Sequence, residues 1–337
     1  MKKILITGGC GFIGTNASLF FLKKKFKVFV IDDLSRKGSK TNLTFLKNFK
    51  NFFFFKKSIN NEKFLKSIII KHKFDLIIHL AGQVAVTTSI KFPEQDMKTN
   101  LISTFNILEV IRKYSKKTVL IFASSNKVYG SIKNVKLKKN KTRYYPYKKD
   151  FKGIDEDHNL DFHSPYGCSK GAADQYVIDY ARIYNLKTFT LRQSCIYGKF
   201  QTGLEDQGWI AWIMQRSINK KKINIYGDGK QVRDALYISD LIDLYYKLFK
   251  SSKNLKANQF NVGGGLNNSI SLIELINWLK KSKQSPIYKF KKRRSGDQNY
   301  FVSNNHKITK LTGWKPTTKI EIGLNNLYEW ITKKINY

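Results

Sequence analysis

The feature that most constrains the fold is a glycine-rich turn between an apolar run and a helical stretch at the start of the chain. Residues 4–7 form the apolar run, Gly8, Gly11 and Gly14 follow it, and an amphipathic stretch covers residues 13–24. Glycines at this spacing permit a tight turn, let backbone amides approach a pyrophosphate and allow the helix to pack closely on the strand. This order predicts a dinucleotide-binding unit with the anion at the helix N-terminus.

The first half of the chain continues this alternation of short apolar runs and longer amphipathic stretches. Such a rhythm predicts a parallel sheet, because each crossover between parallel strands needs a connection of helical length. We expect an α/β fold of the doubly wound Rossmann type. The expected strands are residues 4–7, 28–31, 52–55, 76–80, 119–123 and 188–191, and the expected helices include residues 13–24, 62–71 and 96–114.

The regular alternation fades after Arg192, which predicts a second, smaller α/β lobe that binds the substrate. The segment 136–152 is basic and aromatic, and we expect it to be a solvated loop. Residues 259–262 are an expected strand, and the C-terminal helix is expected to end near Lys333. The expected dinucleotide-binding domain is residues 1–192 with a return near 230–262, and the expected substrate lobe is residues 193–229 and 263–337.

The chain carries a formal net charge of +38 at pH 7, from 62 Lys and Arg against 24 Asp and Glu. A positive potential of this size attracts polyanions, so nucleic-acid binding is one alternative function. However, the lysines are spread along the whole chain, and no recognition-helix, RNP-like or zinc-finger pattern accompanies them. We interpret the charge as a compositional bias that favours anionic small substrates, without a nucleic-acid partner.

Cysteine spacing and hydropathy indicate the cellular compartment in which the protein works. Cys10, Cys168 and Cys195 form no CxxC pair, and no apolar run approaches the roughly twenty residues of a membrane span. We therefore expect a soluble, cytoplasmic protein with no disulfide framework, no metal and no membrane partner. His79, His163 and Cys168 lack the spacing of a ligand set and are interpreted as structural residues.

An acidic residue ends the second expected strand. Asp32 lies 18 residues beyond Gly14, where a carboxylate can accept hydrogen bonds from the adenosine ribose hydroxyls, and this favours NAD over NADP. Arg36 leaves NADP open, because an arginine here could neutralise a 2′-phosphate. Asp33 is interpreted as an exposed turn residue.

A tyrosine and a lysine suited to proton transfer stand four residues apart, at Tyr166 and Lys170. On a helix both project from one face, so the ammonium could lower the pKa of the phenol, which could then take a proton from a hydroxyl while hydride leaves. The spacing alone is weak evidence. It also occurs at Tyr129, Tyr144, Tyr145, Tyr226, Tyr246 and Tyr288.

The setting singles out Tyr166. Ser164 can cap a helix, Pro165 suits its first position, and an amphipathic run follows. Ser125 directly follows the fifth expected strand, at the carboxyl edge where this architecture binds ligands, so its hydroxyl could hydrogen-bond the reacting alcohol or ketone. Alternatively, Ser124 and Ser125 form a polar loop that satisfies its own backbone.

Several longer segments carry a family resemblance: ITGGCGFIGTN, HLAGQVAVTTSI, SSNKVYG, SPYGCSKGAADQY and GDGKQVRD. Together they resemble the extended short-chain dehydrogenase/reductase family of NAD-dependent sugar-nucleotide epimerases and dehydratases, over nearly the whole chain. The blocks DDLSRKG, AGQVAVTTSI, SSNKVYG, LDFHSPYGCSKGAADQY and EDQGWIAW look, more narrowly, like the CDP-paratose 2-epimerase group, also called CDP-tyvelose 2-epimerase. The resemblance implies an isomerase with bound NAD, a nucleotide-sugar substrate, a homodimer or homotetramer, and a role in lipopolysaccharide synthesis.

By position, the resemblance implies Tyr166 as the base, Lys170 as the residue that holds the nicotinamide ribose, and Ser125 beside the reacting group. Arg233 and Arg294 match places where relatives bind the nucleotide diphosphate, for which a guanidinium is chemically suited, although each could be an ordinary surface cation. The implied cofactor contacts are Gly8, Gly11, Phe12, Ile13, Gly14, Asp32, Leu34, Ser35, Arg36, Leu80, Ala81, Gln83, Asn100, Tyr166 and Lys170, and the implied substrate contacts are Ser125, Asn126, Gln207, Arg233 and Arg294.

The sequence departs from the family pattern at two positions. Ser58 follows the third expected strand, where relatives often have an aspartate that contacts adenine. The sequence therefore does not identify the residue that contacts adenine. Ser125 stands where the closest group usually has threonine, and it keeps the hydroxyl.

The sequence leaves several functions open. The favoured one is transient oxidation and re-reduction at C2 of a CDP-3,6-dideoxyhexose, which converts CDP-paratose to CDP-tyvelose without net redox change. A UDP-sugar 4-epimerase would use the same hydride chemistry. A dehydratase is disfavoured, because relatives of that kind generally place an acidic pair where this chain has Asn126 and Lys127. The non-enzymatic alternative is a basic nucleic-acid-binding protein.

Overall fold

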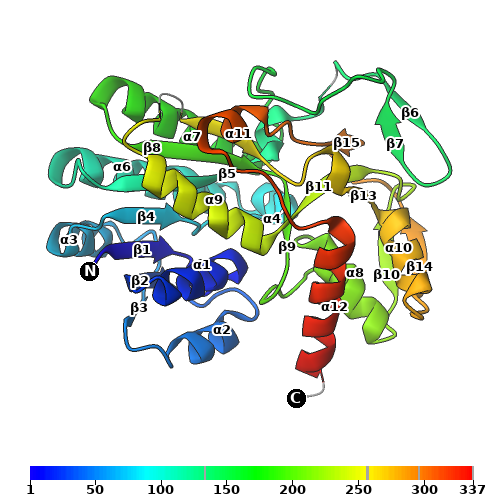
Figure 1. Ribbon diagram of the computed structural model, residues 1–337, viewed down its shortest axis with the longest axis horizontal. Coiled ribbons are helices and arrows are strands. Elements are labelled where there is room, and N and C mark those ends of the chain that lie inside the picture. The colour runs from blue at the N-terminus through cyan, green and yellow to red at the C-terminus, as the bar shows by residue number, and fades with distance from the viewer. Residues whose placement is uncertain (133, 256–257, 295–296, 336–337) are drawn as a thin grey trace. The chain divides into compact units, whose positions relative to one another are not determined.

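A computed structural model describes residues 1–132, 134–255, 258–294 and 297–335 (Figure 1). The chain divides into two compact units. Unit 1 contains residues 1–128, 164–192 and 242–260, and unit 2 contains residues 129–163, 193–241 and 261–337. The chain thus enters unit 2 first at residue 129, well before Arg192. Within the described ranges, no helix is long and apolar enough to cross a membrane.

A seven-stranded parallel sheet runs through unit 1, so the expected α/β fold of the Rossmann type is confirmed (Figure 1). The strand order is β12-β8-β5-β4-β1-β2-β3, which extends the doubly wound order by one strand. The order reverses at β1, whose parallel neighbours are β2 and β4. Ligands of such sheets bind beyond the carboxyl ends of the strands at this point. The strands are β1 (Lys3–Thr7), β2 (Lys27–Asp32), β3 (Phe52–Lys56), β4 (Leu76–His79), β5 (Val119–Ser125), β8 (Thr188–Gln193) and β12 (Gln259–Val262).

Helices cover both faces of this sheet. On one face α1 and α9 meet through the rings of Phe20 and Tyr246, whose centroids are 5.6 Å apart. On the other face α6 packs between α3 and α7. The helical segments are α1 (Phe12–Lys23), α2 (Ser39–Leu46), α3 (Glu62–His72), α4 (Val86–Lys91), α5 (Pro93–Met97), the π-helical turn η1 (Lys98–Ile102), α6 (Ser103–Tyr114), the 3-10 turn η2 (Asn126–Tyr129), α7 (Ser164–Tyr184) and α9 (Ile238–Ser251).

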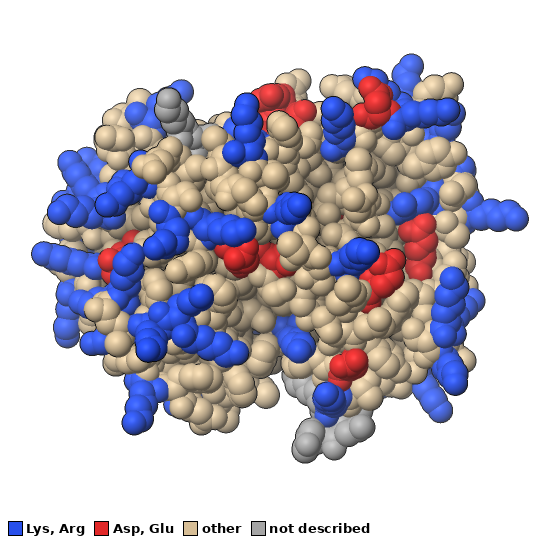
Figure 2. Space-filling view, in the orientation of Figure 1, with Lys and Arg blue, Asp and Glu red and all other residues tan. Residues whose placement is uncertain are grey.

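The cations on the face shown in Figure 2 do not gather in one cluster. Figure 2 shows Lys and Arg side chains across the whole visible face, with few Asp and Glu side chains between them. This dispersion agrees with the spread of lysines along the sequence and gives a generally positive surface.

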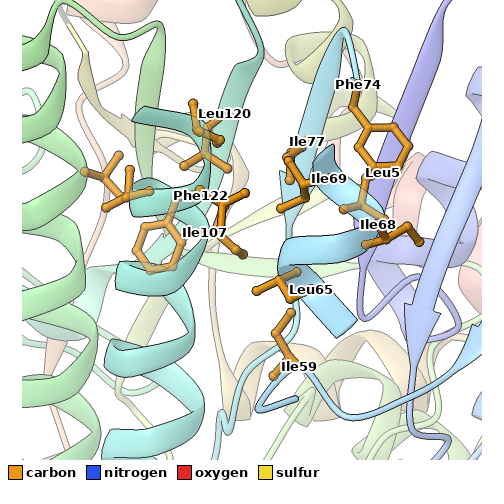
Figure 3. Packing of buried hydrophobic residues seen from close by; sticks show 14 of the residues in the cluster. Leu5, Ile59, Leu65, Ile68, Ile69, Phe74, Ile77, Ile107, Leu120 and Phe122 are labelled. Carbon is orange, nitrogen blue, oxygen red and sulfur yellow. The ribbon is translucent and has the colours of Figure 1, made fainter. Parts of the chain in front are cut away.

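An apolar core lies between the sheet and the helices α3, α6 and α7. Leu5, Ile77 and Leu120 project from β1, β4 and β5 to this face and meet Ile69 of α3 and Ile107 of α6, all of them fully buried (Figure 3). Alternate residues of a strand point to opposite faces, so the near-continuous apolar runs of β1 and β4 reflect burial on both sides. This packing positions α3 and α6 relative to the carboxyl ends of the strands.

The helix expected over residues 96–114 begins earlier and is interrupted. It starts at Pro93, the first residue of α5, where proline lacks only an amide hydrogen that a helix start leaves unpaired. It then passes through the π-helical turn η1 before α6 continues to Tyr114. A π turn holds one residue more than an α turn, which a pattern search with a 3.6-residue period does not detect.

A buried ion pair joins α7 to the sheet. Arg192 of β8 places Nη2 2.9 Å from Oδ2 of Asp174 in α7, and the side chains are 4% and 0% exposed. The hydroxyl of Thr190 donates to Oδ1 of the same carboxylate at 2.6 Å. Because every charge in this pair is matched and hydrogen-bonded, the contact sets the register of α7 on β8.

Unit 2 consists of small mixed sheets and helices. β11 is the centre of one sheet: it pairs with β13 in the antiparallel direction and with β15 and β9 in the parallel direction. β10 and β14 form a second pair. The elements are β6 (Leu137–Lys139), β7 (Tyr144–Pro146), β9 (Cys195–Tyr197), α8 (Trp209–Ile218), β10 (Ile223–Tyr226), β11 (Val232–Tyr237), η3 (Leu266–Asn268), β13 (Ser269–Ser271), α10 (Leu272–Lys281), β14 (Tyr288–Lys291), β15 (Tyr300–Phe301), α11 (His306–Thr312) and α12 (Ile320–Ile335).

The expectation of a loop over residues 136–152 is wrong in part, because β6 and β7 form an antiparallel hairpin there. Oδ1 of Asn140 accepts the backbone amides of Thr142 and Arg143, at 2.9 Å each. A side chain that mimics a backbone turn in this way stabilises a hairpin connection that has neither glycine nor proline.

We predict that Gly14→Ala destabilises the protein by about 1–3 kcal/mol, the usual cost of overpacking. A Cβ on Gly14 would lie 2.5 Å from Cα of Gly9, in rigid backbone of the turn. Gly11→Ala is the matched control, because its Cβ would meet only the Gly8 carbonyl oxygen at 3.2 Å. Urea unfolding followed by circular dichroism measures both. Equal midpoints for the two variants would contradict the packing argument.

Candidate active site

The glycine-rich turn lies between β1 and α1, with Phe12 and Ile13 as the first two residues of the helix. Gly8 has a φ of +67° and donates its amide to Ile31 O at 2.8 Å, so the turn is bound to the end of β2. A Cβ on Gly8 would lie 2.9 Å from the Ala81 nitrogen. Glycine is required here, because the chain after β4 passes directly over the turn. The open N-terminus of α1 is suited to a pyrophosphate.

Asp32 faces the glycine turn from the end of β2. Its Oδ2 accepts the Cys10 amide at 2.9 Å, and its Oδ1 accepts the Leu34 amide at 2.8 Å. Burial, above all, raises the pKa of this carboxyl, and the two amides oppose that effect. A carboxylate oxygen accepts more than one hydrogen bond, so both oxygens keep capacity for ribose hydroxyls. Asp33 instead accepts the amide of Ser35, at 2.9 Å, in a local turn.

Arg36 reaches from the chain after β2 to the chain after β4, where its Nη2 donates to Gly82 O at 3.2 Å. Burial lowers the pKa of its guanidinium, while the charges of Tyr166, Asp33 and Asp32 favour the cation. An arginine predicted only as a cofactor contact therefore also acts electrostatically on the candidate catalytic tyrosine.

The chain after β4 is tied to β1 through hydroxyl groups. Leu80 and Ala81 both donate their amides to Thr7 Oγ1 at 3.2 Å. The same hydroxyl lies 2.7 Å from Nδ1 of His79, whose Nε2 lies 3.0 Å from the Thr104 hydroxyl. Burial lowers the pKa of His79 to about 3, so the ring stays neutral and acts as a structural link.

Ser125 and Tyr166 are brought together at the carboxyl edge of the sheet, where Ser125 ends β5 and its hydroxyl is hydrogen-bonded to the phenol. The predicted helix start is confirmed, since Ser164 Oγ accepts the Gly167 amide at 3.3 Å. The Tyr166 pKa is raised, because burial outweighs the Ser125 hydrogen bond and the Arg36 charge. The phenol is therefore protonated in this state of the chain.

Lys170 lies one turn after Tyr166 on α7. Its Nζ donates to Ala123 O at 2.8 Å and lies 4.5 Å from the centre of the Phe122 ring. Burial lowers its pKa to about 8, although Asp96 and Asp174 favour the ammonium. The expectation that Lys170 lowers the Tyr166 pKa is therefore corrected: Ser125 and Arg36 have that effect here, while the lysine is bound to the β5 backbone.

A buried polar group that the sequence did not indicate lies beside Lys170. Asp96, fully buried in α5, accepts hydrogen bonds from Gln83 Nε2 at 2.9 Å and Asn100 Nδ2 at 3.1 Å, and from the Ser169 hydroxyl. Gln83, predicted to line the cofactor cleft, uses its amide here and on the Ala85 backbone. Asp96 stands in a polar run, and only its tertiary burial distinguishes it.

Asn100 presents an unused acceptor within this group. Its Oδ1 is buried and has no hydrogen-bond partner, and a Cβ on Gly82 would lie 2.7 Å from that oxygen and 3.5 Å from Lys170 Nζ. A buried acceptor without a partner is costly unless a ligand or water completes it. Together with the glycine turn and the two oxygens of Asp32, it fits a bound dinucleotide.

Two more predicted positions lie in unit 1. The Asn126 Oδ1 is 3.4 Å from the Ser125 hydroxyl, which also accepts the Lys127 amide at 3.2 Å. Ser58, where relatives often have aspartate, accepts the Asn60 amide at 3.2 Å in a local turn. The hydroxyls of Ser125 and Ser58 therefore organise the backbone that follows them.

The remaining predicted substrate residues belong to unit 2 and lie on different elements. Arg233 of β11 pairs with Asp297 at 2.8 Å. Arg294, after β14, pairs with Asp206 at 2.8 Å and lies over the ring of Tyr226, 3.9 Å from its centre. Gln207 exchanges two backbone hydrogen bonds with Leu204 ahead of α8. Ser295 and Gly296, within the RSGD segment that suggested Arg294, are outside the described residues.

Comparison with known proteins identifies the family of this chain. The family described as GDP-mannose 4,6 dehydratase matches residues 5–327. The CDP-paratose 2-epimerase of Salmonella typhi is 42% identical over 340 residues, which cover 97% of this chain and 98% of that protein.

Two solved structures of nucleotide-sugar epimerases are also similar to this chain over its full length. The UDP-glucose 4-epimerase of Thermotoga maritima, determined with UDP-glucose, is 29% identical, with a TM-score of 0.82 and coverage of 99% of both chains. The UDP-glucuronic acid 4-epimerase of Bacillus cereus, in complex with UDP-glucuronic acid and NAD, is 26% identical, with a TM-score of 0.84 and coverage of 98% of this chain and 99% of that one. This chain therefore belongs to the extended short-chain dehydrogenase/reductase family of NAD-dependent nucleotide-sugar epimerases and dehydratases.

Proposed function

We propose that this enzyme inverts C2 of a CDP-3,6-dideoxyhexose, converting CDP-paratose to CDP-tyvelose without net redox change. The observation that carries the proposal is the Ser125 hydroxyl hydrogen-bonded to a buried Tyr166 phenol, one helical turn from Lys170, at the carboxyl edge of a Rossmann sheet. The sugar is supported by the full-length similarity to the CDP-paratose 2-epimerase of Salmonella typhi.

In this proposal Tyr166 takes the proton of the C2 hydroxyl and later returns it to the same oxygen. Ser125 donates or accepts a hydrogen bond at that oxygen and so holds it beside the phenol. Burial favours the protonated phenol before substrate binds, so Tyr166 must first release its own proton to water and act as the base in the phenolate form, which the Ser125 hydroxyl and the Arg36 charge favour. Burial around Tyr166 also excludes water from the oxidised sugar.

NAD supplies a reversible hydride acceptor at C2 when it is bound. The glycine turn and the α1 N-terminus would hold its pyrophosphate, and Asp32 the adenosine ribose. Lys170 would hold the nicotinamide ribose, and the free Asn100 Oδ1 would accept a further hydrogen bond. Inversion requires that the keto sugar present its other face before hydride returns to C2.

We assign nucleotide recognition to unit 2. Arg233 and Arg294 would bind the diphosphate, since a guanidinium can contact two phosphate oxygens at once. Each now pairs with a carboxylate, Asp297 or Asp206, which the diphosphate would have to displace or share. Gln207 would add a polar contact to the sugar nucleotide. A homodimer or homotetramer remains part of the proposal.

A UDP-sugar 4-epimerase is the second candidate, because two of the similar structures are UDP-sugar 4-epimerases. Dehydration is less favoured although the matching family is described as a dehydratase. Elimination of water needs an acid for the departing hydroxyl and a base for the ring proton, and the residues after Ser125 are Asn126 and Lys127.

The direct test is incubation with CDP-paratose deuterated at C2, followed by NMR. We expect CDP-tyvelose that keeps its deuterium, because hydride leaves and returns within one active site. UDP-glucose and UDP-glucuronic acid serve as competing substrates. Conversion of a UDP-hexose alone would refute the C2 assignment.

Replacement of the proposed base tests the mechanism. Tyr166→Phe should lower kcat by about 10²–10⁴-fold, the usual contribution of a positioned acid or base, with the fold and the NAD content retained. Tyr246→Phe is the matched control, because Tyr246 has the same four-residue spacing to Lys250 but lies on α9. Similar activity of the two variants would exclude Tyr166 as the base.

Replacement of the ribose carboxylate tests cofactor selection. Asp32→Asn should weaken NAD binding about ten- to hundredfold, because it removes charge-assisted hydrogen bonds, and should raise the NADP to NAD affinity ratio since Arg36 remains. Titration of cofactor-stripped enzyme with each nucleotide measures both effects. Asp33→Asn changes an exposed turn residue and should bind NAD within about twofold of the unchanged enzyme. An Asp32→Asn variant with unchanged affinities would argue against this ribose contact.

A further inference from the structure

A fully buried carboxylate lies behind the candidate catalytic pair and contacts neither of its members directly. Oδ1 of Asp96 accepts from Gln83 and Asn100, and Oδ2 accepts from Ser169, the residue before Lys170 on α7. All three donors are neutral. None of these hydrogen bonds therefore brings a cation to Asp96, which holds, through Ser169, the turn of α7 that carries Lys170.

Of the two carboxylates that act on Lys170, Asp96 is the one with no ion-pair partner among the residues that the structure describes. The other carboxylate that acts on Lys170, Asp174 of α7, is paired with Arg192. His79 of β4 is neutral, and Tyr166 is protonated. From β5, Lys170 meets the Phe122 ring and the Ala123 carbonyl, which carry no net charge. A nearby opposite charge stabilises a buried charge, and a lysine is the kind of group that can compensate Asp96.

We propose that Asp96 is the buried counter-charge of Lys170: a positioning residue that keeps the lysine an ammonium and holds it on α7 beside Tyr166. This inference rests on the proposed function, since it assigns a role to Lys170 in the same site. Asp96 need not touch the substrate or the cofactor. Its effect is transmitted through space to Lys170 and through the Ser169 hydroxyl to the helix.

The proposal has a definite sign. Asp96 favours the ammonium of Lys170, so removal of its charge lowers the Lys170 pKa. Asp96 also disfavours the phenolate of Tyr166, which Ser125 of β5 and Arg36 favour, so the same change lowers the Tyr166 pKa. Both limbs of a bell-shaped pH–rate profile should then move toward lower pH, whichever of the two groups governs each limb.

The experiment compares the pH dependence of kcat/KM in the holoenzyme and in Asp96→Asn. We expect both limbs of Asp96→Asn to lie about half a pH unit or more below those of the unchanged enzyme. Asp96→Glu, which keeps the charge, should restore the limbs even if packing lowers the rate. Loss of rate with both limbs in place would reduce Asp96 to a packing residue and overturn the proposal.

Glu94→Gln is the matched charge control. Glu94 lies on the same short helix, its side chain is 75% exposed, and its partner is Lys98. It removes one negative charge at the surface, so the limbs should stay in place. Asp96→Ser is a second neutral variant if Asp96→Asn does not fold, because its smaller side chain leaves room for water beside the three donors. Equal shifts in Glu94→Gln and the neutral Asp96 variants would also overturn the proposal.

A second measurement does not depend on turnover. NMR of the lysine ammonium in ¹⁵N-lysine-labelled protein, with Lys170 assigned by its loss in Lys170→Arg, gives the pKa of Lys170 directly. That pKa should fall in Asp96→Asn and stay in Glu94→Gln. A failure of C2 epimerisation with this fall present would count against the proposed function alone, and an unchanged Lys170 pKa would count against the role of Asp96.

Discussion

The ion pair between Asp174 and Arg192 is the contact on which the arrangement of the site depends. It joins the helix that carries Tyr166 and Lys170 to β8, and both side chains are essentially removed from water. Loss of one partner from such a pair typically costs about 3–5 kcal/mol, because the other charge is left buried alone. This ion pair prevents α7 from sliding along the sheet and from rotating about its own axis. The Tyr166 phenol and the Lys170 ammonium therefore keep their distances from the end of β5.

The expected fold could be derived almost completely from local patterns. The inner strands of the parallel sheet are buried on both faces and appear as short apolar runs, whereas the edge strand β3 is only partly buried. The glycine turn is equally predictable, because a side chain at Gly8 would collide with the backbone at Ala81. The start of α7 could be located because Ser164 and Pro165 act through local chemistry. The hairpin of β6 and β7 was missed, since its turn depends on the side chain of Asn140 and not on glycine or proline.

The candidate site was less predictable than the fold. The positions at the ends of elements predict Tyr166, Lys170 and Ser125 as site residues. Their pKa values depend on burial, however, and the spacing of residues in the sequence does not show which side chains are buried. For this reason the direction of the Tyr166 pKa was predicted wrongly, and Asp96 and Ser169 were missed. The surface has the opposite character, because its many cations are dispersed (Figure 2) and give a general attraction for anions. The chemistry of the site therefore depends on a few buried charges.

The π-helical turn between α5 and α6 limits how the sequence can change in length. It inserts one residue beyond the α-helical count at Lys98–Ile102, between Asp96 and the apolar face of α6. Deletion of one residue would restore a regular helix and rotate everything before it by about 100° relative to α6. Asp96 would then point away from Ser169 while the core packing of α6 survived. Substitutions can accumulate in this segment, whereas a single-residue deletion would leave the core folded and remove Asp96 from the site.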